Sequence, residues 1–497
     1  MIREDQEATK SSKIGHSQTP ALRASETSDD VKVDEHLSAS QQQEITSLLN
    51  EFQDVLTDLP GSTLLCEHDI QLTSKEPIRR RPYALPHALQ NTVKNEVEAM
   101  LKMGVVEPST SPYASPIVLV DKKDGTKRFC VDFRALNQIT VFDAEPLPDP
   151  EHIFASISRD RYFSKFDLTK GYWQVPVKEE AKPYTAFVTP AGLFQFRKMP
   201  FGLVNAPATF SRMMRLVLNG LENTHNFIDD VLVHSENWED HVNTIRALLS
   251  RLREVGLTAK PSKCEVGKQT VEFLGHVVGK GTLQPQPDKL TQVRNAKRPE
   301  TKKELRSFLG FVGYYRRFIP NFAALAVPLT DLTKAKLPNR IEWGEPQEVA
   351  FTALKNRLST PPILHLPDCT RQFFLRTDAS NTGIGVVLLQ EKDDTGEKFP
   401  VSYASRKLLP RERGYATVEK EALAIVWGIQ KFEPYLYGRE FVLQTDHQSL
   451  SYLQKSKLTN ARIMRWALAL QPYRFRVDSI KSSQNVGADF LSRTDCE

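Results

Sequence analysis

The chain has 497 residues, of which 40% are hydrophobic and 26% charged, and its formal net charge is +5. This composition is that of an ordinary soluble globular protein, and the length predicts about three or four structural units. The five cysteines form no C-x-x-C pair, which argues against a zinc site and a disulfide framework and suits a reducing compartment. No apolar run is long enough to span a membrane and no signal peptide is evident, so we expect an intracellular protein without a membrane partner.

The first elements follow a polar segment. Residues 1–36 are rich in Ser, Thr, Asp and Glu and lack hydrophobic periodicity, which predicts disorder. Residues 44–56 carry a helical apolar stripe, and residues 89–108 predict a helix that ends near Gly104. Residues 115–134 predict two strands around an Asp-Gly turn. Strands and helices then alternate to about residue 280.

A basic stretch covers residues 288–317, where "TKKE" at 301–304 is a capping box that opens a helix. Two interpretations are equally open: a solvated helix face over an apolar stripe, or a surface that contacts nucleic acid. Its basic residues are Lys289, Arg294, Lys297, Arg298, Lys302, Lys303, Arg306, Arg316 and Arg317. Prolines between residues 320 and 367 then indicate a linker-like region with one helix near 346–358, and a second α/β unit begins near residue 371.

Three acids stand in apolar surroundings. Asp229 and Asp230 are adjacent within "FIDDVLV", which is typical of a hairpin, and Asp167 comes late in the predicted strand of "RYFSKFD". Carboxylates that converge in this way repel one another unless cations lie between them, and Mg²⁺ prefers such ligands. A pair of metal ions could then activate a 3′-hydroxyl and stabilise a leaving pyrophosphate. The alternative is that these are ordinary acids of surface turns.

A second group of acids lies beyond residue 371. Each comes at the end of a different predicted element or at a helix margin, an arrangement that again suits two metal ions. The four acids are Asp378, Glu421, Asp446 and Asp489.

Several motifs together resemble a known family. "FDLTKGYWQ", "MPFGLVNAPATFSRMM", "FIDDVLVHS", "AKPSKCEV" and "FLGHVV" occur in the order and spacing of the reverse transcriptase–ribonuclease H portion of Ty3/gypsy-type LTR retrotransposon Pol polyproteins. The resemblance runs from about residue 37 to the end. It implies an α+β multidomain fold, a right-hand polymerase followed by an RNase H-like α/β domain. Its expected parts are fingers and palm at 37–285, thumb at 286–330, connection at 331–370 and RNase H-like domain at 371–497.

The resemblance also implies a function. We expect an RNA-directed DNA polymerase that copies retrotransposon RNA by two-metal nucleotidyl transfer and degrades the RNA of RNA–DNA hybrids. Mg²⁺, or Mn²⁺ in its place, would be the cofactor, with two ions per site. The expected partners are an RNA template, a DNA or tRNA primer, RNA–DNA hybrid and dNTPs, and the expected location is cytoplasmic, including virus-like particles. The rival hypothesis is an inactive, host-retained nucleic-acid-binding protein.

Residue roles follow from the same motifs. The resemblance implies catalytic and metal-binding roles for Asp167, Asp229, Asp230, Asp378, Glu421, Asp446 and Asp489. It assigns Lys122 (or Lys123) and Arg128 to binding of the nucleotide triphosphate, and Tyr172 to a gate that excludes the 2′-hydroxyl. Phe201 would lie beside the nucleotide, and Gly202 would let the backbone approach the template or nucleotide closely. Lys263 or Lys260 would protonate pyrophosphate. Two departures are Phe227 in place of the usual Tyr, and a loop before Asp489 that lacks the usual His.

Overall fold

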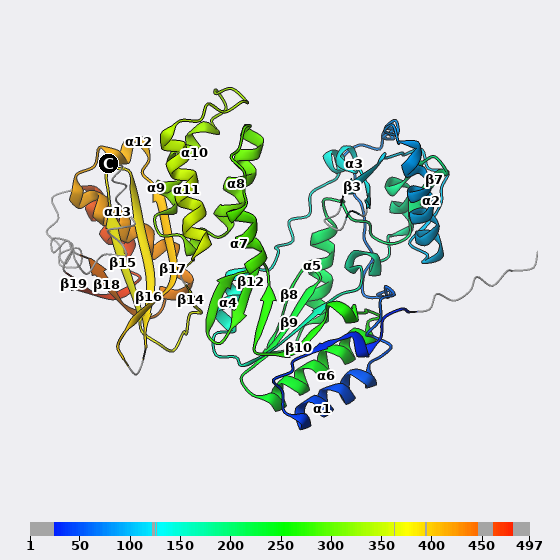
Figure 1. The fold of residues 1–497 in the computed structure, drawn as a ribbon, viewed down its shortest axis with the longest axis horizontal. Coiled ribbons are helices and arrows are strands. Elements are labelled where there is room, and N and C mark those ends of the chain that lie inside the picture. The colour runs from blue at the N-terminus through cyan, green and yellow to red at the C-terminus, as the bar shows by residue number, and fades with distance from the viewer. Residues whose placement is uncertain are drawn as a thin grey trace, which may run out of the picture.

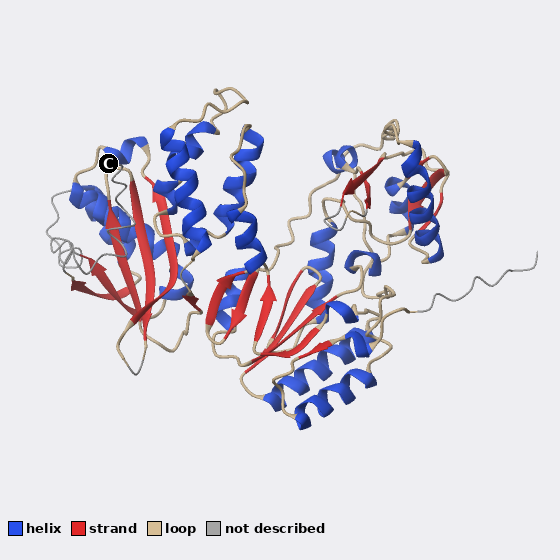
Figure 2. Ribbon diagram, in the orientation of Figure 1, coloured by secondary structure: helices blue, strands red, loops and turns tan. Residues whose placement is uncertain are grey.

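The computed structural model describes residues 24–121, 125, 127–361, 363–392, 395–445 and 461–480. Lys122, Asp446 and Asp489 therefore lie outside the described residues. Three sheet-containing bodies follow one another in space, from the fingers and palm through a helical middle body to a C-terminal sheet (Figures 1 and 2). Within the described ranges, no helix has both the length and the apolar character needed to cross a bilayer.

A five-stranded sheet forms the palm, in the order β1-β10-β5-β9-β8. Its strands are β1 (Lys32–Val33), β10 (Glu265–Lys268), β5 (Tyr162–Asp167), β9 (Asp230–Ser235) and β8 (Thr224–Phe227). Two amphipathic helices, α6 (Trp238–Glu254) and α1 (Ala39–Glu51), cover its outer side (Figure 1). The indole of Trp238 donates to Glu44 at 2.8 Å and Arg246 pairs with Glu51 at 2.6 Å, so α1 is fixed to α6. A third helix, α5 (Ala206–Val217), belongs to the same core.

The N-terminal prediction was wrong in part. Residues 24–36 are structured, whereas disorder was predicted for the whole of residues 1–36. A short 3-10 helix spans Ser28–Asp30, and β1 pairs in parallel with β10, with Lys32 opposite Glu265. A two-residue strand has no detectable alternation, and its partner lies far along the chain, so composition alone could not reveal the pairing.

The fingers combine helices with two small sheets. One sheet has the order β2-β7-β6, and the other is the hairpin β3-β4 that the Asp-Gly signal predicted. The helix predicted at 89–108 is α2, which ends at Lys102, shortly before Gly104 in its left-handed conformation. The elements are α2 (His87–Lys102), β2 (Val106–Pro108), β3 (Ile117–Asp121), β4 (Lys127–Val131), α3 (Arg134–Ile139), β6 (Phe187–Thr189) and β7 (Gly192–Phe196).

The middle body is one core. The sheet β11-β12-β13-β14 and several helices bury their apolar faces together, from Ile153 of α4 to Leu366, and Phe163 and Leu232 of the palm strands belong to the same cluster. The strands are β11 (Thr270–Phe273), β12 (His276–Gly279), β13 (Thr282–Pro285) and β14 (Leu364–His365); the helices are α4 (Pro150–Ser156), α7 (Pro287–Arg294), α8 (Lys302–Tyr314), α9 (Phe322–Leu325), α10 (Val327–Leu332) and α11 (Glu345–Ser359). The expected thumb and connection therefore share a core, and the proline-rich segment is no extended linker.

The C-terminal body is a mixed sheet in the order β17-β16-β15-β18-β19. Its strands are β15 (Phe373–Ala379), β16 (Gly383–Glu391), β17 (Lys398–Lys407), β18 (Glu440–Thr445) and β19 (Arg474–Ser479); its helices are α12 (Pro410–Arg413), α13 (Thr417–Lys431), α14 (Glu433–Leu436) and α15 (Ala461–Leu470). Strands β15, β18 and β19 run parallel, and α13 packs against β15 and β16. Arg159 of the palm donates to Thr370 at 2.6 Å, and Lys407 pairs with Asp331 at 3.1 Å, so this body is held against the other two.

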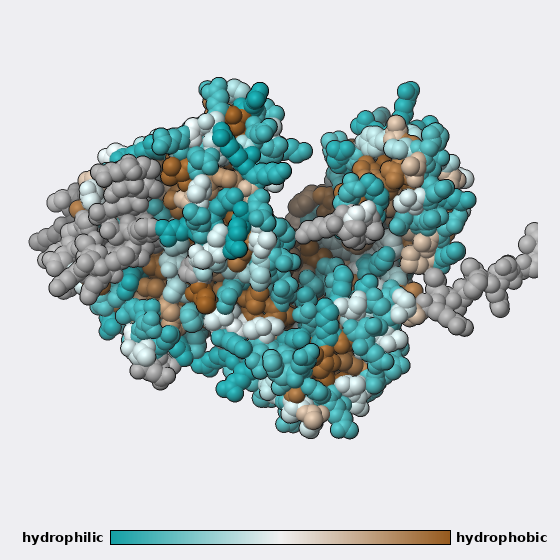
Figure 3. Space-filling view, viewed as in Figure 1, coloured by the Kyte–Doolittle hydropathy of each residue, from teal (hydrophilic) through white to brown (hydrophobic). Residues whose placement is uncertain are grey.

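A hollow separates the fingers from the helices of the middle body (Figure 3). Hydrophilic residues form most of the visible surface on either side of it. In this view the palm sheet lies below the hollow (Figure 1). Two halves of the molecule thus face each other across an open space above the palm.

Candidate active sites

The palm acids sit at a tight hairpin. Strands β8 and β9 are joined by the two residues Ile228 and Asp229, with Phe227 and Asp230 as the closing pair. Ile228 has φ +56°, a left-handed conformation that is strained for a β-branched residue. Backbone strain of this kind persists only where the surrounding structure enforces it, and it concentrates at functional sites.

All three predicted palm acids come together. Asp167, the last residue of β5, lies opposite Asp230, the first residue of β9. The amide of Leu168 donates to the carbonyl oxygen of Asp229 at 3.0 Å, which draws the hairpin turn onto the end of β5. The predicted convergence of Asp167, Asp229 and Asp230 is therefore present in the fold.

The environment disfavours ionisation of the hairpin acids. Burial raises the pKa of Asp230 to about 6; the neighbouring Asp229 and Asp167 contribute in the same direction, while Lys165 opposes them. Burial and the charge of Asp167 also raise the pKa of Asp229. Clustered carboxylates that share a partly desolvated site carry negative charge that a cation would relieve.

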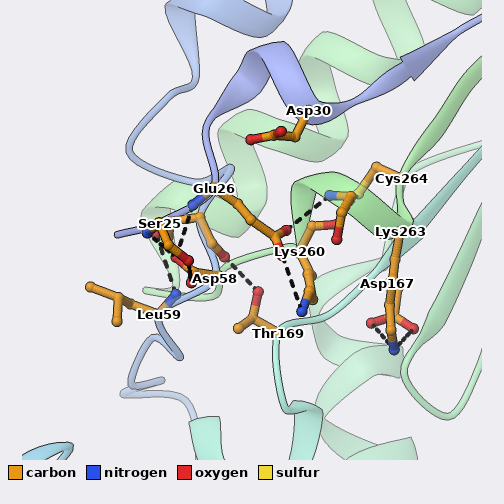
Figure 4. A network of polar contacts seen from close by, with 12 residues as sticks. Ser25, Glu26, Asp30, Asp58, Leu59, Asp167, Thr169, Lys260, Lys263 and Cys264 are labelled. Atoms are coloured by element: carbon orange, nitrogen blue, oxygen red, sulfur yellow. Dashed lines mark hydrogen bonds and ion pairs between the residues drawn. The ribbon is translucent and has the colours of Figure 1, made fainter. Parts of the chain in front are cut away.

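Lys263 supplies one such charge. Its ammonium group donates to both carboxylate oxygens of Asp167, at 3.1 and 2.9 Å (Figure 4). Burial opposes the charged form, but the hydrogen bond to Asp167 and the three palm carboxylates outweigh it and raise the pKa of Lys263. Lys260 instead pairs with Glu26 at 3.2 Å. Of the two lysines considered from the sequence, Lys263 is thus the one at the acids.

The palm acids fit a divalent cation by their chemistry. They are hard oxygen ligands with unfavourable mutual repulsion, as Mg²⁺ sites require. In the part of the chain that the structure describes, no three His, Cys, Asp or Glu side chains are already arranged around an ion position. The ammonium group of Lys263, which donates to both oxygens of Asp167, offsets part of the negative charge of the palm acids.

Aromatic rings border the acids. The centroid of the Tyr172 ring lies 5.0 Å from that of the Phe201 ring and 5.5 Å from that of the Phe210 ring. Burial, with a contribution from Asp229, raises the pKa of Tyr172 to about 12, so the phenol stays neutral. Phe201 is 52% exposed, and Gly202 has φ +96°, which a residue with a side chain rarely adopts.

The fingers hairpin carries Arg128, which is exposed on β4 opposite Val120. An exposed guanidinium can contact phosphate in a bidentate manner. Lys122, the other residue assigned to the triphosphate, lies outside the described residues.

A second pair of acids meets in the C-terminal body. Asp378 is the penultimate residue of β15, as predicted, and Glu421 is on α13, which packs against that strand. The Ala379 amide donates to a Glu421 carboxylate oxygen at 3.2 Å, so the two acids lie beside each other. Both are buried, at 5% and 2% exposure, which places Glu421 deeper than its expected position at the helix margin.

Comparison with known families gives two matches, one over the fingers and palm and one over the C-terminal body. Residues 120–278 match the model described as reverse transcriptase (RNA-dependent DNA polymerase), and residues 368–473 match that of the RNase H-like domain found in reverse transcriptase. The chain is 37% identical over 477 residues to the retrovirus-related Pol polyprotein from transposon 297 of Drosophila melanogaster, covering 93% of this chain and 44% of that relative. It is 37% identical over 445 residues to that from transposon gypsy of the same species, covering 85% and 42%.

The chain belongs to the Ty3/gypsy-type reverse transcriptase–ribonuclease H family. The transposon Tf2-3 polyprotein of Schizosaccharomyces pombe is 32% identical over 464 residues, with 90% of this chain and 34% of that relative covered. The chain thus spans less than half the length of these Pol polyproteins. Reverse transcriptase and RNase H-like domains generally depend on divalent metal ions.

Solved structures show the same fold. A foamy viral protease–reverse transcriptase in complex with double-stranded DNA has a TM-score of 0.81 and 21% identity, covering 93% of this chain and 83% of that one. A foamy viral protease–reverse transcriptase in complex with an RNA/DNA hybrid has a TM-score of 0.78 and 21% identity, covering 96% and 66%. The expected fold, a reverse transcriptase followed by an RNase H-like domain, is confirmed.

Three features of the reverse transcriptase centre were missed from the sequence. Gly171, which lies against Asp229, has a detectable signal, since glycine is used where the backbone must come close to another group. Ile228 has none, because its side chain type argues against the conformation it adopts. Glu26 lies in the segment predicted to be disordered, although it contacts Lys260.

Proposed function

We propose that this chain is an RNA-directed DNA polymerase with ribonuclease H activity, which copies an RNA template into DNA and degrades the RNA strand of the resulting hybrid. The single observation that carries the polymerase assignment is the meeting of Asp167 with Asp230 across β5 and β9, beside Asp229. Membership of the family supports both activities. The complexes of related folds with DNA and RNA/DNA hybrid support nucleic acid as the partner.

Asp167, Asp229 and Asp230 would hold two Mg²⁺ ions, with Mn²⁺ as a substitute. When bound, such ions activate the primer 3′-hydroxyl and stabilise charge on the phosphates. Lys263 would hold positive charge at the same centre. Arg128 and Lys122 would orient the triphosphate of the dNTP, and the Tyr172 ring would exclude a 2′-hydroxyl, with Phe201 and Gly202 beside the nucleotide.

Asp378 and Glu421, with Asp446 and Asp489, would form the cleavage centre. Two carboxylates on adjacent elements can orient a water molecule and divalent ions toward a phosphodiester. Because the two reactions use separate acids, a substitution in one group should abolish one activity and leave the other. The RNA template, a DNA or tRNA primer and dNTPs are the substrates that this assignment requires.

Primer extension tests the proposal directly. Purified chain is given an RNA template, a DNA primer, four dNTPs and Mg²⁺, and Asp229→Asn is the matched variant because asparagine keeps the shape without the charge. We expect extension by the wild type, none with EDTA, and a loss of at least about a hundredfold in Asp229→Asn. Tight hybrid binding without any extension would instead support the rival, an inactive nucleic-acid-binding protein.

A further inference from the structure

An N-terminal strap, defined as residues 24–34, lies across the turn that carries Lys263 (Figure 4). The turn itself is a short 3-10 helix, Pro261–Lys263, between the palm acids and β10. In the strap, the amide of Lys32 donates to the Cys264 carbonyl and that of Asp34 to the Val266 carbonyl, both at 3.0 Å. The strap thereby extends the palm sheet by one strand beyond β10.

Glu26 makes the strap's contact with the turn itself. One carboxylate oxygen accepts from the Ser262 amide at 3.0 Å, and the other pairs with Lys260 at 3.2 Å. Burial opposes ionisation of Glu26, yet the hydrogen bonds from Ser262 and the charge of Lys260 outweigh it and lower its pKa. A single carboxylate thus holds the backbone and one side chain of the turn at once.

The strap is anchored on its far side. The Ser25 amide donates to Asp58 at 2.9 Å, and the Ser25 hydroxyl donates to the other oxygen of the same carboxylate (Figure 4). The Ser28 hydroxyl donates to Asn50 at 2.8 Å. Glu26 therefore projects from a segment that is fixed on both sides, which limits the positions its carboxylate can take.

The turn connects directly to the palm acids. The Lys260 amide donates to the Asp167 carbonyl at 2.8 Å, and the Lys263 ammonium donates to both side-chain oxygens of Asp167. A long lysine side chain loses considerable rotamer freedom when held in one place. A displacement of the turn backbone would therefore move the point from which the Lys263 side chain reaches Asp167.

We propose that the strap is part of the polymerase centre, with Glu26 as a positioning residue that holds the 260–264 turn and thereby fixes Lys263 at Asp167. The inference rests on the proposed polymerase function. It predicts that Glu26 acts on the rate of synthesis through Lys263 and has no part in cleavage, because its partners Ser262 and Lys260 lie in the palm.

The first test compares three variants of the full chain. Glu26→Gln keeps the size of the side chain but loses the charge, Glu26→Asp keeps the charge, and Asp29→Asn removes an exposed acid of the same strap as a control. We expect Glu26→Gln to lower kcat for extension by about three- to tenfold with little change in KM for dNTP, and Glu26→Asp to restore part of it. Hybrid cleavage should match the wild type in all three, and the melting temperature should fall by no more than a few degrees in Glu26→Gln, which loses the ion pair with Lys260.

The decisive measurement is a double-mutant cycle with Lys263→Met, which keeps the length of the side chain without its charge. If Glu26 acts through Lys263, Glu26→Gln has no further effect in the Lys263→Met background. An equal drop in both backgrounds, or no drop in the wild-type background, overturns the proposal.

Hydrogen exchange provides a readout that does not depend on activity. The Ser262 amide, whose hydrogen bond Glu26 accepts, should exchange faster in Glu26→Ala, which removes the acceptor, while amides of β9 remain protected. Unchanged exchange at Ser262 overturns the strap contact. If the wild type fails to extend any primer, the proposed function fails, and this exchange measurement still decides whether Glu26 holds the turn.

Discussion

Gly171 lies directly against Asp229: a Cβ atom at Gly171 would come within 3.0 Å of the Asp229 Cβ and 3.7 Å of its Oδ2. Gly171→Ala therefore requires the hairpin turn to move by a few tenths of an ångström. Because a misplaced catalytic group costs much more rate than stability, we expect extension to fall about ten- to a hundredfold while the melting temperature changes by only a few degrees. Steady-state extension and thermal unfolding measure the two effects.

Gly414→Ala is the matched control for this prediction. Gly414 has φ −79°, and the nearest atom to a Cβ added there is the Arg411 carbonyl oxygen at 4.0 Å. The same methyl group should leave extension at the wild-type level there. A Gly171→Ala enzyme as active as Gly414→Ala would mean that the approach of Gly171 to Asp229 has no role in synthesis.

The raised pKa of Asp230 predicts a cost in stability. Its value rises from 3.8 to about 6 on folding, so the folded state binds the proton more tightly, and stability falls as the pH rises from about 4 to about 6. The full penalty applies above pH 6. In EDTA at neutral pH, the free energy of unfolding of Asp230→Asn should therefore exceed that of the wild type by about 1–3 kcal/mol.

Denaturant unfolding at a series of pH values measures this difference. The gain of Asp230→Asn should shrink toward zero near pH 4, where the wild-type carboxyl is already protonated. Asp29→Asn, which removes an exposed acid, serves as the control. If Asp230→Asn raises the free energy of unfolding by the same amount at all pH values, the effect comes from packing and not from the charge of Asp230.

Whether a contact could be predicted from the sequence depends on how far apart its two partners lie along the chain. Local patterns sufficed for the Asp229–Asp230 hairpin, the helices and the Asp-Gly hairpin of the fingers, because each signal lies within about twenty residues. The strap, which pairs with β10, could not be predicted because its partner is remote and its strand has two residues. The choice between Lys260 and Lys263 likewise depended on Glu26, which only the fold brings near.

The basic stretch illustrates the same limit. Lys302 was grouped with candidate phosphate contacts, but it is buried and its ammonium group donates to the Lys334 carbonyl at 2.6 Å and to the Leu337 carbonyl. Neither of the two interpretations of the stretch holds at Lys302, because its ammonium group is bound to backbone carbonyls inside the fold. Thr301 does begin α8 by accepting from the Glu304 amide, while the Glu304 carboxylate accepts from Glu300.

The exposed members of this stretch are expected to contact nucleic acid. Three of them, Lys297, Lys303 and Arg316, are exposed on the middle body. Their triple replacement by Ala should weaken binding of RNA–DNA hybrid similarly for all sequences and lower the magnitude of the salt slope by about one unit per contact. Lys302→Ala is the contrasting variant, with a loss of about 1–3 kcal/mol in stability and an unchanged slope. If the triple variant binds hybrid like the wild type, the basic stretch is a solvated surface and does not contact nucleic acid.

Tyr172 is expected to discriminate between sugars. Its ring is held between Phe201 and Phe210, so it cannot swing aside at low cost. Tyr172→Ala should raise the use of rNTPs relative to dNTPs by about ten- to a hundredfold, which single-nucleotide incorporation measures. Tyr172→Phe keeps the ring and should retain the discrimination. An unchanged ratio in an active Tyr172→Ala enzyme would leave Tyr172 as a core residue only.

The central claim is that the palm acids carry synthesis and that a separate pair, Asp378 with Glu421, carries cleavage. One assay tests it: a labelled RNA template annealed to a DNA primer, with dNTPs and Mg²⁺, in which extension and RNA cleavage are followed together for the wild type, Asp229→Asn and Asp378→Asn. The account predicts that Asp229→Asn stops extension and still cuts the hybrid, whereas Asp378→Asn extends the primer and leaves its RNA intact. Loss of both activities in either folded variant, or retention of both, would contradict it.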